Sequence, residues 1–172
     1  MKRIITATVQ DRSGVLNRIT GMLHKRQFNI DSISVGKSET EGISKMTFVV
    51  EVSDHQNLEQ LTKQLNKQID VIKVSDITDK AIVARELALI KVGSNGHQRA
   101  EIQGIISPFR ASVIDVSKES MTIQVTGKPD KVEALIELLH PYGIKELTKT
   151  GVTAFLRGHQ PKTVTDLHAT PL

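Results

Sequence analysis

Residues 2–35 decide the fold, and they read KRIITATVQ-DRSG-VLNRITGMLHKRQ-FNIDSISV. The first block alternates apolar and polar side chains, as a half-buried strand does. The third block spaces Val15, Ile19 and Leu23 so that they share one face of a helix. The DRSG block between them is a tight turn that leads directly from strand to helix. The last block alternates again and predicts a second strand.

The turn over residues 11–14 predicts a binding site for a carboxylate. A strand that enters a helix directly leaves backbone N–H groups unpaired at the helix N-terminus, where the helix dipole also favours negative charge. A free amino acid has a carboxylate for this end, and Asp11 could bind its ammonium group. The turn therefore favours a small-molecule sensor over a catalyst. Explanations without a ligand stay open: Gly14 permits the tight turn, and Ser13 caps the helix.

The pattern continues as a βαββαβ unit and is then repeated. A third strand is expected over residues 45–52, a helix capped by Asp54 follows it, and a fourth strand covers residues 71–77. This order is that of the ferredoxin-like fold. The second half repeats it, with strands and helices alternating in the same way over residues 85–92, 100–106, 109–116, 121–126, 129–139 and 144–148.

The sequence thus predicts an α+β protein with two tandem ferredoxin-like βαββαβ domains. We expect the first domain over residues 1–78, a linker over 79–84, the second domain over 85–150 and a polar tail over 151–172. In the second domain, Ser94-Asn95-Gly96 stands where Arg12-Ser13-Gly14 stands in the first. A polar run follows it instead of an apolar one, so no effector is expected at this second turn.

Composition excludes several classes of function. The chain of 172 residues has no cysteine, which excludes disulfides, thiolate metal sites and cysteine nucleophiles. Its six histidines lack the spacing of metal ligands, and no glycine-rich nucleotide motif is present. No stretch approaches the roughly 20 apolar residues of a membrane-spanning helix, and the first apolar run is too short for a signal peptide. We expect a cytoplasmic protein with no catalytic site, metal or cofactor of its own.

RNA binding is the alternative from a different class, because RNA-recognition motifs share the βαββαβ order. Those modules stack bases on aromatic side chains that are exposed on their first and third strands. Here the first strand offers Thr6 and Thr8, and the third strand has Phe48 as its single aromatic residue. The net charge of +4 is spread along the chain rather than gathered in blocks. No nucleic-acid partner is expected.

Short motifs in both halves of the chain carry a resemblance to a known family. They are DRSGVLNR at 11–18, FNIDS at 28–32, SKMT at 44–47, QLNKQIDV at 64–71, REL at 85–87, IDV at 114–116 and TG at 150–151. With these motifs the chain resembles the small regulatory subunits of acetolactate synthase, which begin with an amino-acid-sensing ACT domain. A free-standing ACT-type sensor of another enzyme is the alternative, but the second half matches the small-subunit family specifically.

The resemblance implies a regulatory subunit without an active site. Its partner would be the large catalytic subunit, which holds thiamine diphosphate, a divalent metal and a flavin. That subunit condenses pyruvate with pyruvate or 2-oxobutyrate on the way to the branched-chain amino acids. The small subunit would raise this activity and confer feedback inhibition by valine, or by leucine or isoleucine.

The resemblance also implies where the effector binds. Two chains would form a homodimer through their ACT domains, and the effector would lie between them. Backbone groups of one chain would meet its carboxylate, and residues of the other chain would close the site; these residues are Gly14, Val15 and Leu16, then Asn29 and Ile30. Many relatives have Asn where this chain has Asp11, whose charge could either bind the effector ammonium or repel its carboxylate.

Overall fold

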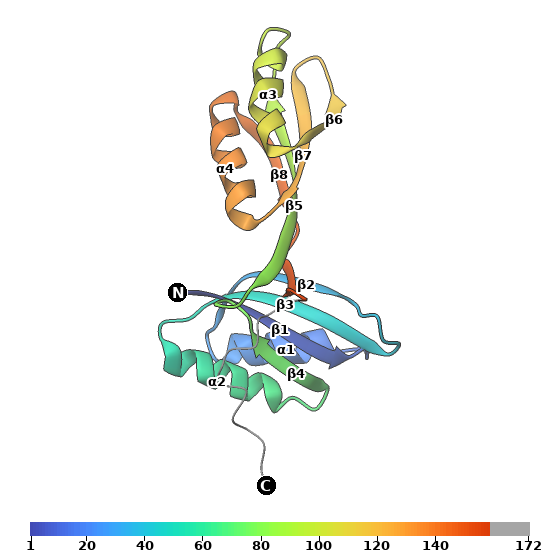
Figure 1. Cartoon of the computed structure of the whole chain (residues 1–172), viewed down its shortest axis with the longest axis vertical. Coiled ribbons are helices and arrows are strands. Elements are labelled where there is room, and N and C mark those ends of the chain that lie inside the picture. The colour runs from blue at the N-terminus through green and yellow to red at the C-terminus, as the bar shows by residue number, and fades with distance from the viewer. Residues whose placement is uncertain (159–172) are drawn as a thin grey trace.

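A computed structural model describes residues 1–158 as two domains joined end to end (Figure 1). Most of the expected tail, residues 159–172, lies outside the described residues. Each domain is an antiparallel sheet with two helices on one face. The structure therefore confirms the predicted α+β class and its two tandem ferredoxin-like units.

The first domain contains the expected βαββαβ order. Its elements are β1 (Lys2–Gln10), α1 (Val15–Lys25), β2 (Asn29–Lys37), β3 (Ile43–Glu51), α2 (His55–Asn66) and β4 (Val71–Asp76). The strands lie in the order β2-β3-β1-β4, so β2 and β4 form the edges. The carboxylate of Asp54 caps α2 by accepting the Asn57 backbone N–H at 2.8 Å, as its position predicted.

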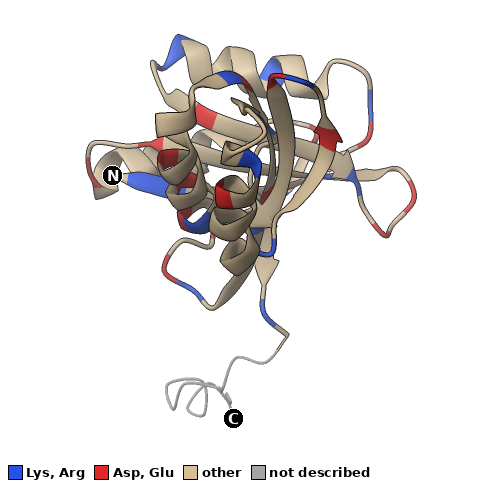
Figure 2. Ribbon diagram, turned by 90° about the horizontal axis from the view of Figure 1, so that it is seen from above, with Lys and Arg blue, Asp and Glu red and all other residues tan. Residues whose placement is uncertain are grey.

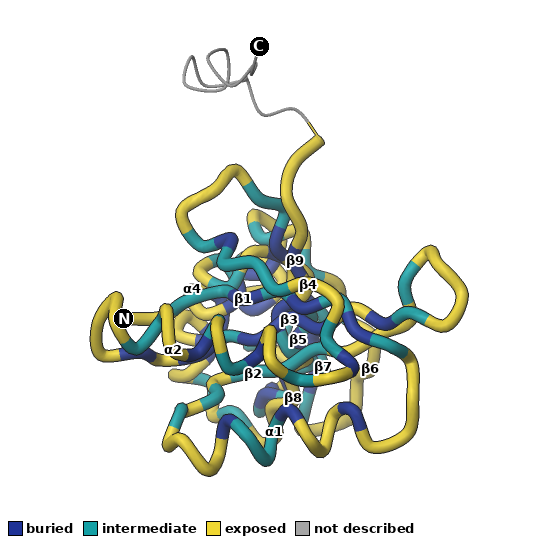
Figure 3. The backbone as a smooth tube through the Cα atoms, turned by 90° about the horizontal axis from the view of Figure 1, so that it is seen from below, coloured by how far each residue is buried: buried dark blue, intermediate teal, exposed yellow. Residues whose placement is uncertain are grey.

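The core of the first domain lies between the sheet and its two helices. Alternate residues of β1 and β3 point into it, among them Ile5 and Phe48, which are fully buried. The helices contribute the residues that helical spacing predicted: Ile19 and Leu23 from α1, Leu61 and Leu65 from α2. Buried positions follow the central strands, whereas the loops and outer helix turns are exposed (Figure 3).

The second domain repeats this arrangement. Its elements are β5 (Ile82–Gly93), α3 (Gln98–Ile106), β6 (Ser112–Val116), β7 (Ser120–Gly127), α4 (Pro129–Leu139) and β8 (Ile144–Lys149). The strand order is β6-β7-β5-β8, which corresponds to that of the first sheet. We expected β6 to start at Phe109, but a short 3₁₀ turn, Ser107–Phe109, delays it. Pro108 at the start of this turn favours that conformation.

Strands extend into the segments that we expected to be a linker, 79–84, and the start of a polar tail, 151–158. The strand β5 already begins at Ile82, and its first four residues pair with β9 (Thr153–Leu156). This β5–β9 ribbon lies on the face of the first sheet that α1 and α2 leave open (Figure 1). Apolar burial explains it, because Ala84, Val152 and Ala154 pack there against Ile4 and Val49.

A polar cluster fixes the end of β4 beside the junction. The guanidinium group of Arg3 binds the carboxylate of Asp76, and it also lies 2.7 Å from that of Asp79. Asp76 further accepts the Thr78 backbone N–H at 3.0 Å and its hydroxyl at 2.6 Å. Partial burial raises the pKa of the Asp76 carboxyl, but the hydrogen bonds from Thr78 and Arg3 outweigh it and hold this pKa below its ordinary value.

This cluster predicts a pH-dependent contribution to stability. Because the folded pKa is lowered, the contribution is complete above the unfolded pKa of about 3.9 and is lost as the pH falls through the folded value. We expect Asp76→Asn to lower the free energy of unfolding by about 1 kcal/mol at pH 7. Urea unfolding at several pH values should show this difference shrinking below about pH 4. A difference that stays constant with pH would contradict the assignment.

The surface carries charges of both signs. Lys and Arg alternate with Asp and Glu over both domains instead of forming one basic face (Figure 2). Among residues 1–158, no helix is long and apolar enough to span a membrane.

Candidate functional site

The turn between β1 and α1 is held at its β1 end by two backbone hydrogen bonds. The Gln10 N–H donates to the Asp70 carbonyl at 2.8 Å, and the Asp11 N–H donates to the Gly42 carbonyl at 2.8 Å. These bonds tie the end of β1 to the α2–β4 loop and the β2–β3 loop. The residues of the turn, Asp11 to Gly14, are themselves exposed. The turn is therefore fixed in position but open to solvent.

Gly14 starts the helix in a conformation that favours glycine. It is the N-cap residue of α1, with φ +82°, and no side chain among residues 1–158 accepts a hydrogen bond from the first turn of the helix. Our prediction that Ser13 caps the helix was wrong. The chain enters α1 through the left-handed Gly14 instead, one residue later than a Ser13 cap requires.

Two backbone donors at this helix end have no partner in the described part of the chain. The first helical bond runs from the Arg18 N–H to the Gly14 carbonyl at 3.0 Å, and the Val15 N–H reaches the Arg12 carbonyl at 3.4 Å. No hydrogen bond from the N–H of Leu16 or Asn17 is found within residues 1–158. The first turn also has no acidic side chain. Such a helix end can accept a carboxylate.

The equivalent turn of the second domain is capped in part by its own side chains. The Asn95 side-chain oxygen accepts the N–H groups of His97 at 3.1 Å and Gln98 at 2.9 Å. In return, the Gln98 side chain accepts the Asn95 N–H at 3.1 Å. This capping occupies the N–H of Gln98, the first residue of α3, but no hydrogen bond from the N–H of Arg99 or Ala100 is found within residues 1–158. The absence of an effector at this turn stays a prediction.

The remaining predicted site residues lie at the opposite end of the first sheet. Asn29 pairs with Glu51, which pairs with Lys2 at the start of β1. The turn between β1 and α1 follows Gln10 at the other end of β1. Within one chain, the structure therefore does not bring Asn29 and Ile30 together with Gly14. Asn29 is exposed and Ile30 is half-buried.

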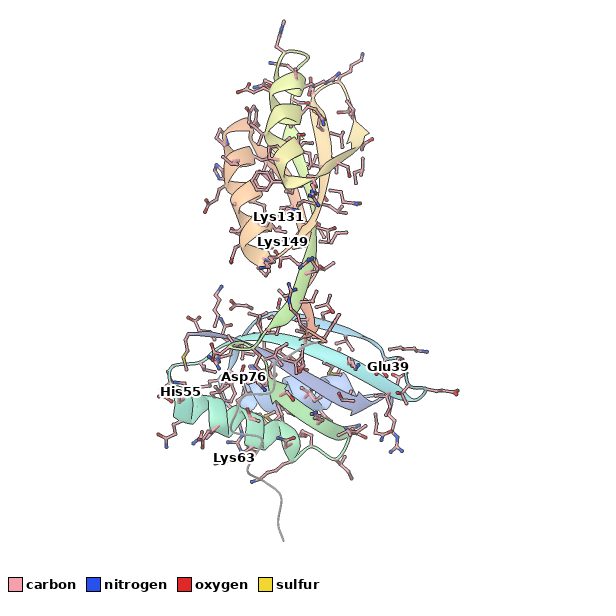
Figure 4. All side chains as sticks on the ribbon, in the orientation of Figure 1. Glu39, His55, Lys63, Asp76, Lys131 and Lys149 are labelled. Carbon is pink, nitrogen blue, oxygen red and sulfur yellow. The ribbon has the colours of Figure 1, made fainter. Side chains whose placement is uncertain are left out.

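A large hollow lies between the domains, away from the turn. It has a volume of about 1170 Å³, and Asn29 and Ile30 line it together with residues of the second domain. One of these is Lys149, whose ammonium lies 3.8 Å from the buried carboxylate of Glu86 and 3.4 Å from that of Glu133. Lys149 stands at the end of the second domain that faces the first (Figure 4).

Two residues at the turn were missed by the sequence reasoning. The guanidinium group of Arg18 lies 2.5 Å from the carboxylate of Asp70, beside Gly14. The two residues are far apart in the chain, so hydrophobic periodicity gave no sign of the pair. Both nevertheless fall within the motifs quoted above, at 11–18 and 64–71. Among residues 1–158, no cluster of histidine or acidic side chains is placed to hold a metal ion.

Comparison with known proteins identifies the class to which this architecture belongs. Residues 5–73 match the family model described as the AHAS small subunit-like ACT domain. Residues 85–158 match the model for the small subunit of acetolactate synthase. The chain belongs to the family of acetolactate synthase small subunits.

Individual relatives agree with this assignment over almost the whole chain. The acetolactate synthase small subunit of Bacillus subtilis is 66% identical over 162 residues, which is 94% of each chain. The probable acetolactate synthase small subunit of Archaeoglobus fulgidus is 48% identical and aligns with 93% of this chain over 99% of its own. The crystal structure of the small subunit from Thermotoga maritima superimposes with a TM-score of 0.83 at 36% identity, covering 93% of this chain and 99% of that one.

Proposed function

We propose that this protein is the regulatory subunit of an acetolactate synthase. It activates a large catalytic subunit that carries thiamine diphosphate, a divalent metal and a flavin, and it makes that enzyme sensitive to valine or to leucine or isoleucine. Membership of the small-subunit family supports the partner. The single observation that supports the sensing role is the uncapped start of α1 at Gly14.

The site is completed by a second copy of the chain. In the first sheet β2 is an edge strand, so its outer backbone groups are free to pair with another strand. An antiparallel pair of β2 strands would place the start of one beside the end of the other. The end of β2, Lys37, pairs with Ser44, which pairs with Val9 just before the turn. Such a dimer brings Asn29 of one chain toward Gly14 of the other.

The chemistry of this composite site suits a small apolar amino acid. The carboxylate binds the free N–H groups of Leu16 and Asn17 and the positive end of the helix dipole. The isopropyl group packs on aliphatic side chains such as Leu16, which is exposed. The ammonium group of the ligand faces either Asp11, in the turn that binds the carboxylate, or Asn29 of the other chain.

Feedback inhibition requires that valine bind one arrangement of the complex better than another. A ligand with equal affinity for the activating and the inhibited arrangement would shift neither. A coupling free energy of about 1–3 kcal/mol gives a 5- to 150-fold effect, which is typical of allosteric proteins. A site shared between two chains provides such a difference, because any change in their pairing changes the site.

Calorimetric titration of the purified chain with valine tests this function, with lysine as the control ligand. Saturable binding of valine but not lysine supports the proposal, and the complex with the catalytic subunit should then lose activity over the same valine range. The absence of valine binding both to the chain alone and to that complex would overturn the sensing role. Activation of the catalytic subunit without such binding would leave a subunit that activates but does not sense.

Asn29→Ala should weaken the valine response by roughly tenfold, the cost of one or two lost hydrogen bonds to a charged ligand. Activation of the catalytic subunit should stay close to that of the wild type, because Asn29 is exposed at the start of β2. Inhibition curves of the reconstituted enzyme measure both effects. Loss of activation together with valine sensitivity would show that the substitution breaks the dimer or the fold, and would contradict a role limited to effector binding.

A further inference from the structure

The side chain of Arg18 reaches from the helix back to the turn. Side chains of α-helices point toward the N-terminus, and Arg18 is one turn after Gly14. Its Nη2 atom binds the Asp70 carboxylate at 2.5 Å. Its Nη1 atom lies 3.2 Å from the position that a Cβ atom on Gly14 would take. The guanidinium group therefore lies between the buried Asp70 and the effector turn.

Asp70 is a rigid support for this cation. Its side chain is only 7% exposed, and its backbone carbonyl accepts the Gln10 N–H at the end of β1. The side chain of Arg18, in contrast, is 48% exposed. A half-exposed cation that is attached to a buried, fixed carboxylate keeps its position with little loss of conformational entropy on binding a ligand.

The ion pair leaves most donors of the guanidinium group unused. Arginine has five N–H donors in a planar fork, and within residues 1–158 the only hydrogen bond from the Arg18 side chain is the one from Nη2 to Asp70. The Nη1 group faces Gly14, and the Arg18 side chain as a whole is half-exposed. A planar fork with free donors is well suited to a carboxylate, and such charge-assisted hydrogen bonds are about twice as strong as neutral ones.

We propose that Arg18 determines the specificity of the turn for ligands with a free carboxylate, and that Asp70 positions it. The Nη1 group would donate to the effector carboxylate beside the backbone donors of α1. This inference rests on the effector site proposed above and adds a side chain that recognises charge. The alternative is a purely structural ion pair, in which Arg18 and Asp70 only join α1 to the α2–β4 loop and take no part in recognising the ligand.

The test compares two ligands that differ only at the carboxyl group. L-valine and L-valinamide share the ammonium and isopropyl groups, but valinamide has no negative charge. Each is titrated into the full chain by calorimetry, with competition against valine for weak binding. The variants are Arg18→Gln, which removes the cation, and Arg12→Gln, a matched control that removes an exposed cation from the same turn.

We expect Arg18→Gln to weaken valine binding at least tenfold and to change valinamide binding less than twofold. Arg12→Gln should leave both affinities within twofold of the wild type. Thermal unfolding should be preserved in Arg12→Gln. Arg18→Gln should unfold at a lower temperature, because the buried Asp70 carboxylate loses its partner, so the comparison of valine with valinamide is the deciding readout. A purely structural ion pair would instead lower valine and valinamide affinity equally, and this result would overturn the proposal.

The outcomes also separate this inference from the function on which it rests. Wild-type binding of valine together with unchanged affinity in Arg18→Gln would remove the role of Arg18 and leave the sensing function intact. A wild-type chain that does not bind valine, alone or with the catalytic subunit, would overturn both.

Discussion

Gly14→Asp is expected to abolish the response to valine. The residue has φ +82°, where any side chain is strained by about 1 kcal/mol or more. A Cβ atom there would lie 3.2 Å from Nη1 of Arg18, so the new carboxylate would pair with that guanidinium and repel the carboxylate of the effector. We expect valine affinity to fall by roughly a hundredfold or more, equivalent to about 2.7 kcal/mol.

Gly14→Ala is the matched control, because it introduces the same backbone strain and the same Cβ atom without the charge. It should retain a larger share of valine affinity than Gly14→Asp. Calorimetry on both variants, and valine inhibition curves of the reconstituted enzyme, measure the difference. Activation should persist in both. If Gly14→Asp kept wild-type valine inhibition, the effector would have to bind elsewhere.

The two strand-to-helix turns differ in the side chains that cap their helices. Both domains have the same strand order, and both place a turn at the start of their first helix. In the second turn, Asn95 and Gln98 occupy each other's donors. In the first turn no side chain caps the helix within residues 1–158, and the guanidinium group of Arg18 lies beside Gly14. These differences in side-chain chemistry, rather than in the fold, support the proposal that the first turn is the one that binds an effector.

Much of the fold could be predicted from local patterns. Residues 4–9 alternate and residues 15–23 have helical spacing because each segment buries one face. This pattern lies within the segment itself, so it can be read from the sequence. The start of α1 at Val15 was predicted correctly, but its cap was not. A serine cap and a left-handed glycine can both precede a helix, and Ser13 and Gly14 stand side by side in the sequence. The β5–β9 ribbon was missed because only four residues of each strand pair in it, and its buried residues are covered only by contact with a distant sheet.

The candidate site was accessible to sequence reasoning only in part. Gly14 and its neighbours form one continuous motif, so a local argument finds them. Asn29 lies at the far end of the same sheet, and its assignment depends on a second chain and on family resemblance. Arg18 and Asp70 meet only after α2 has packed on the sheet. A single sequence carries no pattern for such a contact between distant segments.

Gly151→Ala is expected to destabilise the contact between the two domains. A Cβ atom at this position would lie 2.4 Å from the carbonyl oxygen of Ile33 and 2.6 Å from its carbonyl carbon. These are backbone atoms of β2, so they can move only if the strand shifts. The adjacent Val152 N–H donates to the Ser32 hydroxyl at 3.4 Å and would be displaced as well. Overpacking of this kind costs about 1–3 kcal/mol.

Gly127→Ala is the matched control for this prediction. Its Cβ atom would lie almost as close to a neighbour, 2.6 Å from Cδ of Lys131, but that neighbour is a flexible side chain that can move away. Urea unfolding should show a loss of about 1–3 kcal/mol for Gly151→Ala and a change below about 1 kcal/mol for Gly127→Ala. Equal losses of unfolding free energy in the two variants would mean that the β2 backbone at Ile33 can move aside as easily as the Lys131 side chain, and would contradict the prediction. Because β2 also carries Asn29 and forms the proposed dimer edge, Gly151→Ala should further weaken valine inhibition, whereas Gly127→Ala should not.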